Sequence, residues 1–438
     1  MPGSLTIRKA KLVLPDRVVT GDLLVEDGVI AEIGPSIART SGEEIDGTGL
    51  TVLPGAIDPH VHFRDPSNNP TESLATGSRA AAAGGVTAFL DMPNNDPTCT
   101  TVERLAAKLD IAAQDSVIHY GFFIGATPDN IDELNAAERA CGIALYMGSS
   151  TGDLLVDEPG DIEKIFMAAN KPIAVHAEDE MRLRERRQLY ESTSDPNDHP
   201  RIRDAETALM ATRLAVEFSL KHGQRLHILH LTSADEVEYL RGVARAKITA
   251  EVCPQHLFMY AEDAYDKIGT RAQSNPPVRT KRHARALWQG LHDGVIQCIA
   301  TDHAPHALEK KGAGYPNTPA GMPGVEWALP LLLHQVNKGR ATLNQVVRWM
   351  CESPARCYNI PRKGRLEIGY DGDIVVVDMA KTRTITDAST RSACGWSPYA
   401  GWDVTGWPVL TTVMGRPVYR DGEIVEGVRG RELNYARS

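Results

Sequence analysis

The sequence is poor in cysteine, and its few cysteines form neither a disulfide framework nor a thiolate metal site. There are seven in 438 residues, they are scattered, and no two of them form a Cys-x-x-Cys pair. An odd number of dispersed thiols is typical of a reducing compartment. We therefore expect a cytoplasmic protein whose cysteines are free.

Long hydrophobic runs and an excess of positive charge are also missing. No apolar stretch approaches the roughly 20 residues that cross a bilayer, and Lys and Arg interrupt the first apolar run, MPGSLTIRKAKLVLP, unlike in a signal peptide. Asp and Glu outnumber Lys and Arg by 57 to 47. We therefore expect neither a membrane nor nucleic acid as a partner. A small anionic substrate is compatible with this charge, because a single arginine can dominate a local site.

Short strands are expected near both ends of the chain. Apolar and polar residues alternate there, in runs that Asp-Gly and Gly turns interrupt, which is the pattern of half-buried strands. The runs are LTIRKAKLVL, GDLLVEDGVIAEIG and EEIDGTGLTVL near the start, and GRLEIGYDGDIVVVDM and VLTTVMGRPVYRDGEIVEG near the end. We predict a small composite β-sandwich domain built from residues 1–54 and 365–438.

The middle of the chain, residues 55–364, alternates short apolar runs with helix-like stretches such as VERLAAKLDIAAQD. The apolar runs are AIDPHVHF, VTAFLDMP, VIHYGFFIG, GIALYMG, KPIAVHAED, RLHILHLTS, KITAEVCPQH and VIQCIATDH. Eight β-α units in series are the number that closes a (β/α)8 barrel. A doubly wound open sheet is the alternative, but no G-x-G-x-x-G follows the first run. We therefore predict an α/β protein with a TIM-like barrel.

Several of these runs end in histidine or aspartate. His60 and His62 are two residues apart, so both side chains point the same way in a strand. The active site of a barrel lies at the C-terminal tips of its strands, where other runs carry His176, His230 and Asp302. Imidazole and carboxylate suit zinc, with manganese and cobalt as alternatives. We predict a metal centre that activates water and polarises a carbonyl, with Asp302 carrying the proton.

The remaining histidines are expected to have other roles. His227 lies three residues before His230, so strand alternation places it on the opposite face, packed under a helix. His119 lies early in its run and is expected to be structural, while the spacing leaves open whether His256 lines the pocket. Surface positions are expected for the histidines of loops and helices, which are His199, His222, His283, His292 and His334.

Six stretches form a recognisable set: PGAIDPHVHFRDP, GSRAAAAGGVTAFLDMPNN, YMGSSTGDLLVD, HAED, HLTS and ATDHAPH. Together with the tail CGWSPYAGWDVTGWPVLTTVMGRPVYRDG, they resemble the cyclic amidohydrolases, and within them the dihydroorotases. The resemblance covers nearly the whole chain. It implies two zinc ions and the reversible cyclisation of N-carbamoyl-L-aspartate to (S)-dihydroorotate, a step of pyrimidine biosynthesis.

The resemblance also implies roles for individual residues. The more buried metal is expected on His60, His62 and Asp302, and the second on His176 and His230, with Asp302 as general acid and base. The residues expected to hold the substrate are Arg64, Asn94, His306 and Asn275. An arginine fork suits a carboxylate. Hydantoinases and allantoinases usually lack this arginine, because their ring substrates carry no carboxylate there.

One position departs from the family pattern. Most relatives of this type carry a lysine in the fourth strand, carbamylated so that it bridges two metals, and Ala144 stands in its place. Another branch uses an aspartate three positions further on, where this chain has Met147. Asp153 could supply the bridge, although it is expected to cap the next helix. Ala144 is either natural or a replacement of that lysine. Without the lysine, we expect one of the two zinc ions to be bound weakly or to be absent.

Three functions follow as hypotheses. The first is a dihydroorotase with weakened or mononuclear chemistry, and the second is a cyclic-amide hydrolase of the hydantoinase or allantoinase class. The third is a catalytically poor homologue that binds a partner such as aspartate carbamoyltransferase. The intact set of histidines, Asp302 and Arg64 favours an enzyme, since a pure scaffold does not need these residues. A homodimer is the default expectation.

Overall fold

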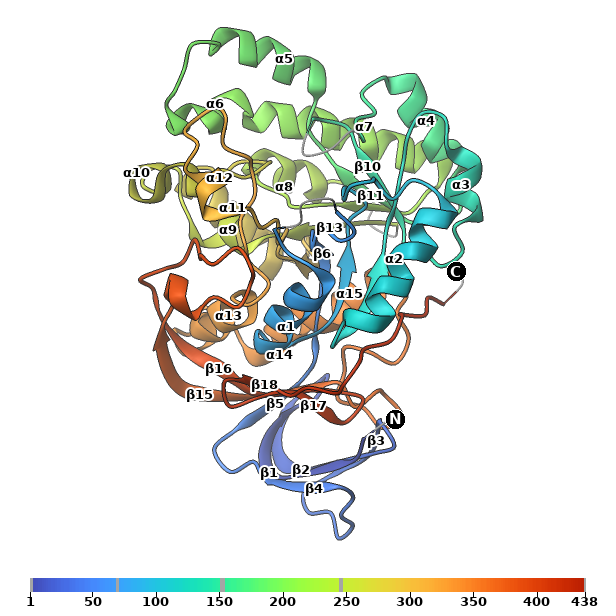
Figure 1. Ribbon diagram of the computed structural model, residues 1–438, viewed down its shortest axis with the longest axis vertical. Helices are drawn as coiled ribbons and strands as arrows, with labels where there is room; N and C mark the ends of the chain where they lie inside the picture. The colour runs from blue at the N-terminus through green and yellow to red at the C-terminus, as the bar shows by residue number, and fades with distance from the viewer. Residues whose placement is uncertain (1–2, 68–70, 150–153, 244–246, 437–438) are drawn as a thin grey trace.

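The computed structural model describes residues 3–67, 71–149, 154–243 and 247–436. Two structural parts are stacked along the long axis of the molecule (Figure 1). A helix-covered barrel forms the upper part of this view, and β strands from both ends of the chain form the lower part. Both parts of the predicted fold are therefore present.

The barrel is built from eight parallel strands of the described residues, and each predicted apolar run contains one of them. They are β6 (Ala56–Val61), β7 (Val86–Asp91), β8 (His119–Phe122), β10 (Ile143–Tyr146), β11 (Ile173–His176), β12 (Leu226–Ile228), β13 (Ile248–Val252) and β14 (Cys298–Ile299). The short β9 (Ile124–Gly125) continues β8 and pairs with β10. The backbone N–H of His62 donates to the carbonyl of His303 at 2.8 Å and closes the ring between β6 and the segment after β14. Ring closure excludes the open-sheet alternative.

Helices follow the strands and cover the barrel (Figure 1). The longer ones are α1 (Leu74–Ala83), α2 (Val102–Asp115), α4 (Pro159–Ala168), α5 (Glu180–Leu189), α7 (Ala205–His222), α8 (Ala234–Arg241), α11 (Lys281–His292) and α13 (Ala328–Asn337). The shorter ones are α3 (Ile131–Ala136), α6 (His199–Ile202), α9 (Pro254–Phe258), α10 (Ala264–Ile268), α12 (Leu308–Lys311), α14 (Leu343–Val347) and α15 (Ser353–Cys357). The ends are set locally: α7 begins where the Asp204 carboxylate accepts from the N–H of Thr207 and ends at Gly223, with a φ of 67°.

The lower part is a nine-stranded sheet that folds into two layers. Its strands are β1 (Leu5–Val13), β2 (Val18–Glu26), β3 (Val29–Gly34), β4 (Glu43–Asp46), β5 (Thr51–Pro54), β15 (Ile374–Thr384), β16 (Asp403–Val413), β17 (Arg416–Arg420) and β18 (Glu423–Ile424). Antiparallel pairing of β5 with β15 joins the two ends of the chain. Buried Leu12, Leu23, Val52, Ile374 and Leu410 belong to one apolar core, so the alternation seen in the sequence marks its inward faces.

Segments from the end of the chain also pack on the barrel. The indole Nε1 of buried Trp396 donates to the carbonyl of His306 at 2.8 Å. Near the end, the N–H of Leu433 donates to the carbonyl of Tyr120 in β8. These contacts tie the region after β15 to the barrel, and the boundaries 1–54, 55–364 and 365–438 stay a prediction.

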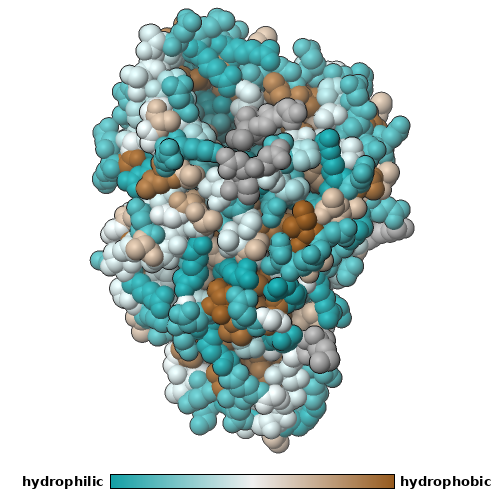
Figure 2. Space-filling model, in the orientation of Figure 1, coloured by the Kyte–Doolittle hydropathy of each residue, from teal (hydrophilic) through white to brown (hydrophobic). Residues whose placement is uncertain are grey.

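The apolar residues lie mainly inside. The face in Figure 2 is largely hydrophilic, with apolar atoms gathered in small separate patches. Within the described ranges, none of the helices is both long and apolar enough to cross a bilayer.

Candidate metal centre

Three side chains converge at the C-terminal end of the barrel. His60 Nε2 and His62 Nε2 lie 3.2 Å apart, and Asp302 Oδ1 lies 3.4 Å from the first and 3.0 Å from the second. A tetrahedral zinc ion with bonds of about 2.0–2.1 Å would hold its ligand atoms roughly 3.3 Å apart. The three atoms thus already have the spacing of one face of a zinc tetrahedron. Elsewhere in the described ranges no other group of three or more His, Cys, Asp or Glu side chains is so arranged.

The other nitrogen of each imidazole has a partner that fixes the ring. His60 Nδ1 lies 2.6 Å from Glu251 Oε1, and His62 Nδ1 lies 2.6 Å from Asn94 Oδ1. An acceptor at Nδ1 takes the ring proton and leaves Nε2 with a free lone pair for a metal. Glu251 is fully buried. Burial raises its pKa, but His60 and His227 outweigh this effect and lower it to about 2, so the carboxylate is ionised.

Asp302 is held as an anion by the same cluster. Burial raises the pKa of its carboxyl, but the neighbouring His60, His62 and His230 outweigh burial and hold the pKa well below its usual range. The backbone at Asp302 is left-handed, with a φ of 47°, a conformation that costs energy in a non-glycine residue and concentrates at functional sites. The residue before it, Thr301, is fixed through its N–H and hydroxyl by Asp58, at 3.1 and 2.6 Å.

A second pair of histidines lies beside the first group. His176 Nδ1 and His230 Nε2 are 3.0 Å apart, and the rings of His60 and His230 are 5.3 Å apart between centroids. His176 Nε2 lies 2.9 Å from Glu178 Oε2, which leaves Nδ1 as the atom of this ring that can bind a metal. His230 Nδ1 is buried and has no hydrogen-bond partner among the described residues. The pair offers two ligand atoms, which face each other.

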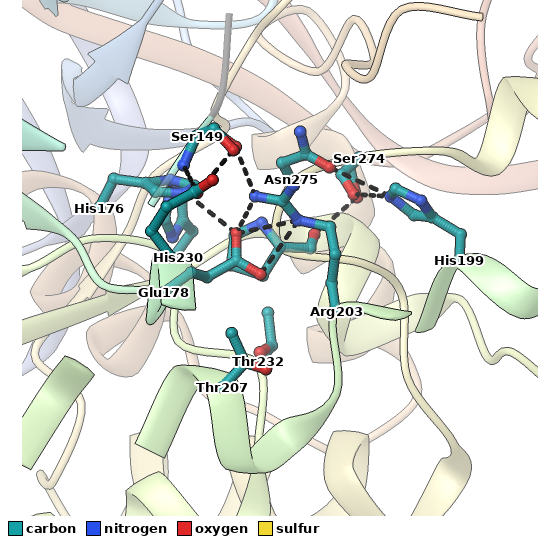
Figure 3. A network of polar contacts seen from close by, with 12 residues as sticks. Ser149, His176, Glu178, His199, Arg203, Thr207, His230, Thr232, Ser274 and Asn275 are labelled. Carbon is teal, nitrogen blue, oxygen red and sulfur yellow. Dashed lines mark hydrogen bonds and ion pairs between the residues drawn. The ribbon is translucent and has the colours of Figure 1, made fainter. Parts of the chain in front are cut away.

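Glu178 is itself held by a buried arginine, as Figure 3 shows. Arg203 Nε lies 3.1 Å from both carboxylate oxygens of Glu178, and its Nη2 also contacts Glu178. The same Nη2 donates to the carbonyl of Ser149 at 2.9 Å. Burial raises the pKa of Glu178, but Arg203 and His176 outweigh it and keep this pKa well below its usual range. The arginine thus keeps Glu178 charged and oriented toward His176.

No bridging ligand is supplied by the positions that the family pattern uses. Ala144 and Met147 are both buried, and neither side chain carries an anion. Asp153, the remaining candidate, lies outside the described residues. Tyr146, two residues after Ala144, has a buried hydroxyl without a hydrogen-bond partner in the described part of the chain. Burial raises the pKa of this phenol, so that it stays protonated and able to donate.

Arg64 brings a positive charge close to this centre. Its Nε and Nη1 atoms are buried and have no hydrogen-bond partner within the described ranges. The neighbouring Asp65 accepts from the N–H of Leu74 at 3.1 Å, and within the described ranges no ion pair joins it to Arg64. Its charge acts on the groups around it: burial and then Arg64 lower the pKa of His306 to about 3.

The other expected substrate residues are engaged with the protein. Asn94 uses its amide oxygen on His62, as described above. His306 Nε2 lies 2.9 Å from the carbonyl of Ala320, and Asn275 Oδ1 lies 3.1 Å from His199 Nε2. Asn275 and Ala320 line a cavity of about 520 Å³. Of the expected substrate residues, Asn275 therefore lines a space that a small molecule can enter, and His306 contacts a residue of its wall.

Two of the predicted positions for histidines were wrong. His227 does not point away from the site: its Nε2 lies 3.0 Å from Glu251 Oε2, on the same carboxylate that contacts His60. Strand alternation fails because β12 ends at Ile228 and His230 has a φ of 34°, which turns its side chain out of the strand pattern. His199 is buried rather than on the surface, and burial lowers its pKa to about 4.

The remaining histidines behave more simply. His119 is structural as predicted, with Nε2 3.2 Å from Asp373 Oδ1. His256 is buried, its Nε2 lies 3.1 Å from the carbonyl of Pro276, and burial lowers its pKa to about 4. The ones that stay at least partly accessible are His222, His283, His292 and His334.

Sequence reasoning missed the carboxylates behind the histidines. Glu251 and Glu178 are fully buried and contact His60 and His176. Their one signal in the sequence is a lone Glu inside or directly after an apolar run, since a charged residue is rarely buried without a partner. The partner, however, comes from a distant part of the chain, 191 residues away for Glu251 and His60.

Comparison with known proteins agrees with this geometry. Residues 51–418 match the amidohydrolase family. A dihydroorotase from Halobacterium salinarum is 35% identical over 428 residues, covering 94% of this chain and 99% of that protein. A dihydroorotase from Methanothermobacter thermautotrophicus is 35% identical over 419 residues, covering 94% of each.

Solved structures of a hydantoinase and a dihydropyrimidinase have a similar fold. The L-hydantoinase (dihydropyrimidinase) from Arthrobacter aurescens superposes with a TM-score of 0.92 at 29% identity, covering 97% of this chain and 98% of that one. The dihydropyrimidinase from Brevibacillus agri has a TM-score of 0.91 at 26% identity, covering 99% and 98%. Fold similarity therefore extends across both the barrel and the terminal sheet.

Proposed function

Because this chain belongs to the amidohydrolase family and is a metal-dependent cyclic amidohydrolase, we propose that it is a dihydroorotase. The reaction is the reversible cyclisation of N-carbamoyl-L-aspartate to (S)-dihydroorotate in pyrimidine biosynthesis. Dihydroorotases match the chain at 35% identity over more than nine-tenths of its length, which supports this substrate over other cyclic amides.

The observation that carries the proposal is Arg64, whose buried Nε and Nη1 atoms have no hydrogen-bond partner among the described residues. A buried charge without a partner is costly, so its presence is best explained by a ligand that supplies the counter-charge. Both N-carbamoyl-aspartate and dihydroorotate carry a carboxylate that a guanidinium can bind in a bidentate manner. Hydantoin itself carries no such group and would leave Arg64 unpaired.

The residues present fit a metal ion, which we propose to be zinc. His60 Nε2, His62 Nε2 and Asp302 Oδ1 would hold it, with Glu251 and Asn94 fixing the two rings. When bound, such an ion would act as a Lewis acid: it would polarise a carbonyl and lower the pKa of a bound water to about 7.

Asp302 is proposed to take the proton of the attacking water in ring opening and to pass it to the leaving nitrogen. In cyclisation the same carboxylate removes the proton from that nitrogen and returns it to the departing oxygen. Its low pKa keeps the carboxylate deprotonated at neutral pH, as a proton acceptor must be. Arg64, Asn94, His306 and Asn275 are proposed to hold and orient the substrate while this proton moves.

The second metal is proposed to bind weakly. His176 and His230 offer two ligand atoms to the second metal, whereas the first metal has three. Ala144 provides no anion that could bridge the two metals. Two divalent ions about 3.5–4 Å apart repel each other, and a bridging carboxylate normally offsets part of that repulsion. We therefore propose a centre with one firmly held zinc and slow turnover.

The decisive experiment measures metal content and turnover on one sample. Purified protein is assayed by elemental analysis and with N-carbamoyl-aspartate, dihydroorotate and hydantoin as substrates. We expect about one zinc per chain and measurable conversion of the first two compounds only. Preference for hydantoin would favour a hydantoinase or allantoinase activity, which the similar solved structures make the second candidate.

The remaining parts of the proposal concern partners and location. Absence of both metal and turnover would leave the chain as a binding partner, for which aspartate carbamoyltransferase is the candidate to test by co-purification. A homodimer is proposed as the default assembly, to be tested by light scattering. A cytoplasmic location is proposed because all seven cysteines are free.

The role of position 144 is tested by Ala144→Lys in the presence of bicarbonate. A carbamylated lysine would add one anionic ligand for each metal, so zinc should rise from about one to about two per chain, with a faster rate. The same variant without bicarbonate is the control. Two zinc ions and full turnover in the unmodified chain would contradict a missing bridge, and Asp153 would then be the residue to change.

A further inference from the structure

A cavity of about 480 Å³ opens at the end of the barrel opposite the metal centre. Residues at the starts of β12 and β13 line it, among them Leu226 and Ile248, which places it at the N-terminal ends of the strands. Its lining also includes His227 and Cys357. The proposed function uses neither of these residues.

A second thiol lies directly behind Cys357. Cys298 in β14 has its Sγ 3.5 Å from the Sγ of Cys357 at the end of α15. Both side chains are buried, and both cysteines are free. The two sulfur atoms are thus in van der Waals contact, and only Cys357 belongs to the lining of the cavity.

The surroundings of Cys357 favour its thiolate form. Contact with Cys298 and then with His227 lowers the pKa of the Cys357 thiol well below its usual value, although burial opposes this. Arg225, whose Nη2 donates to the Cys357 carbonyl at 2.6 Å, adds positive charge, as do Lys247 and Arg356 around the cavity. Thiolates with cationic neighbours and an access path are the reactive cysteines of proteins.

We propose that Cys298 and Cys357 form an oxidisable dithiol, in which Cys357 reacts with a peroxide that enters through this cavity and Cys298 resolves the product. The Cys357 thiolate sulfur attacks one peroxide oxygen, and the O–O bond breaks. Cys357 is oxidised to a sulfenic acid and hydrogen peroxide is reduced to hydroxide. The Cys298 sulfur then attacks the Cys357 sulfur, and the S–O bond breaks. An S–S bond forms, and the Cys298 proton leaves with the hydroxyl group as water.

Another buried cysteine, Cys351, is an internal control for this chemistry. Cys351 lies six residues before Cys357 and is also buried, but its Sγ contacts the carbonyl of Pro54 at 3.4 Å rather than another thiol. Burial raises the pKa of Cys351, so its thiol stays protonated at neutral pH. A general sensitivity of buried thiols would affect Cys351 and Cys357 alike, whereas the proposal concerns Cys357 only.

The test is peptide mapping of the full-length protein after brief treatment with hydrogen peroxide. Trypsin separates the relevant cysteines, because Cys357 lies in residues 357–362, Cys298 in 286–310 and Cys351 in 349–356. We expect a disulfide between the first two peptides, loss of two thiols per chain, and reversal by dithiothreitol. Oxidation spread over all seven cysteines, or no disulfide between these two peptides, would overturn the proposal.

Two variants separate the roles of the two sulfurs, with Cys351→Ser as the matched control. In Cys298→Ser the product should stop at a sulfenic acid on Cys357 that dimedone traps. In Cys357→Ser the residue Cys298 should stay reduced, and Cys351→Ser should form the disulfide as the unmodified chain does. Equal alkylation rates of Cys357 and Cys351 in the folded, reduced protein would also contradict the proposal, and that measurement needs no variant.

Discussion

Replacing Glu251 with glutamine tests whether the carboxylate behind the histidines organises the metal centre. Glu251 contacts His60 Nδ1 at 2.6 Å and His227 Nε2 at 3.0 Å, one imidazole on each carboxylate oxygen. Glutamine has the same shape, but it is neutral and offers one acceptor in place of two. Glu251→Gln therefore removes the negative charge and one of the two accepting positions without opening a cavity.

The expected effect on metal binding follows from the contact with His60. Loss of a partner behind a ligand typically costs about 10–100-fold in metal affinity, which corresponds to roughly 1.4–2.8 kcal/mol. The expected effect on stability follows from both contacts, because a hydrogen bond to a charged group contributes about 1.5–3 kcal/mol. One such bond is lost and the other becomes neutral, so the free energy of unfolding should fall by roughly 3 kcal/mol.

The assay measures zinc affinity by competition with a chromophoric chelator, together with urea unfolding of the metal-free protein. The matched control is Glu236→Gln, which removes another buried carboxylate. Glu236 lies in the first turn of α8, and its carboxylate is hydrogen-bonded to Ser233 and to Thr212 of α7. The control should lose stability and keep its zinc affinity. Unchanged zinc affinity in Glu251→Gln would refute the reasoning that this carboxylate fixes the ring of His60.

Three further predictions address the site and the fold. Arg64→Lys keeps the positive charge but loses the bidentate hydrogen bonding of the guanidinium, so kcat/KM for dihydroorotate should fall about 10–100-fold. Unchanged turnover would show that Arg64 has a structural role instead. The double variant His60→Ala/His62→Ala should lose its zinc, and equal zinc content by elemental analysis would contradict the ligand assignment. Burial raises the pKa of Asp204, but Arg182, Thr207 and Arg186 together outweigh it and lower this pKa to about 2, from 3.8. This stabilisation is complete above pH 4 and is lost as the pH falls toward 2. Asp204→Asn should therefore lower the free energy of unfolding by about 2 kcal/mol at pH 7 and by little at pH 2, and equal losses at both pH values in urea would contradict this.

The sequence alone was sufficient for the architecture. Eight apolar runs with helices between them predicted the barrel, and each run contains a strand because a strand buried on both faces is continuously apolar. VERLAAKLDIAAQD was expected to be helical and coincides with α2. The alternating runs near both ends predicted the terminal sheet, since one face of each strand packs on the core.

Part of the site could also be read from the sequence, because its residues lie at strand ends. Barrel topology places all strand tips at one end, so His60, His62 and Asp302 were expected together although 240 residues separate the last two. Strand periodicity carries such a prediction only as far as the strand itself extends. His230 lies beyond the end of β12 in a left-handed conformation, and for that reason alternation misplaced His227.

Only the tertiary structure decided what surrounds these residues. Glu251 reaches His60 from a different strand, Arg203 reaches Glu178 from the segment before α7, and Cys298 meets Cys357 across the end of the barrel. Each contact joins side chains whose positions depend on how strands and helices pack, which local periodicity does not encode. The sequence determined which residues can do chemistry, and packing determined which of them are charged, oriented and paired, because burial and neighbouring charges set those properties.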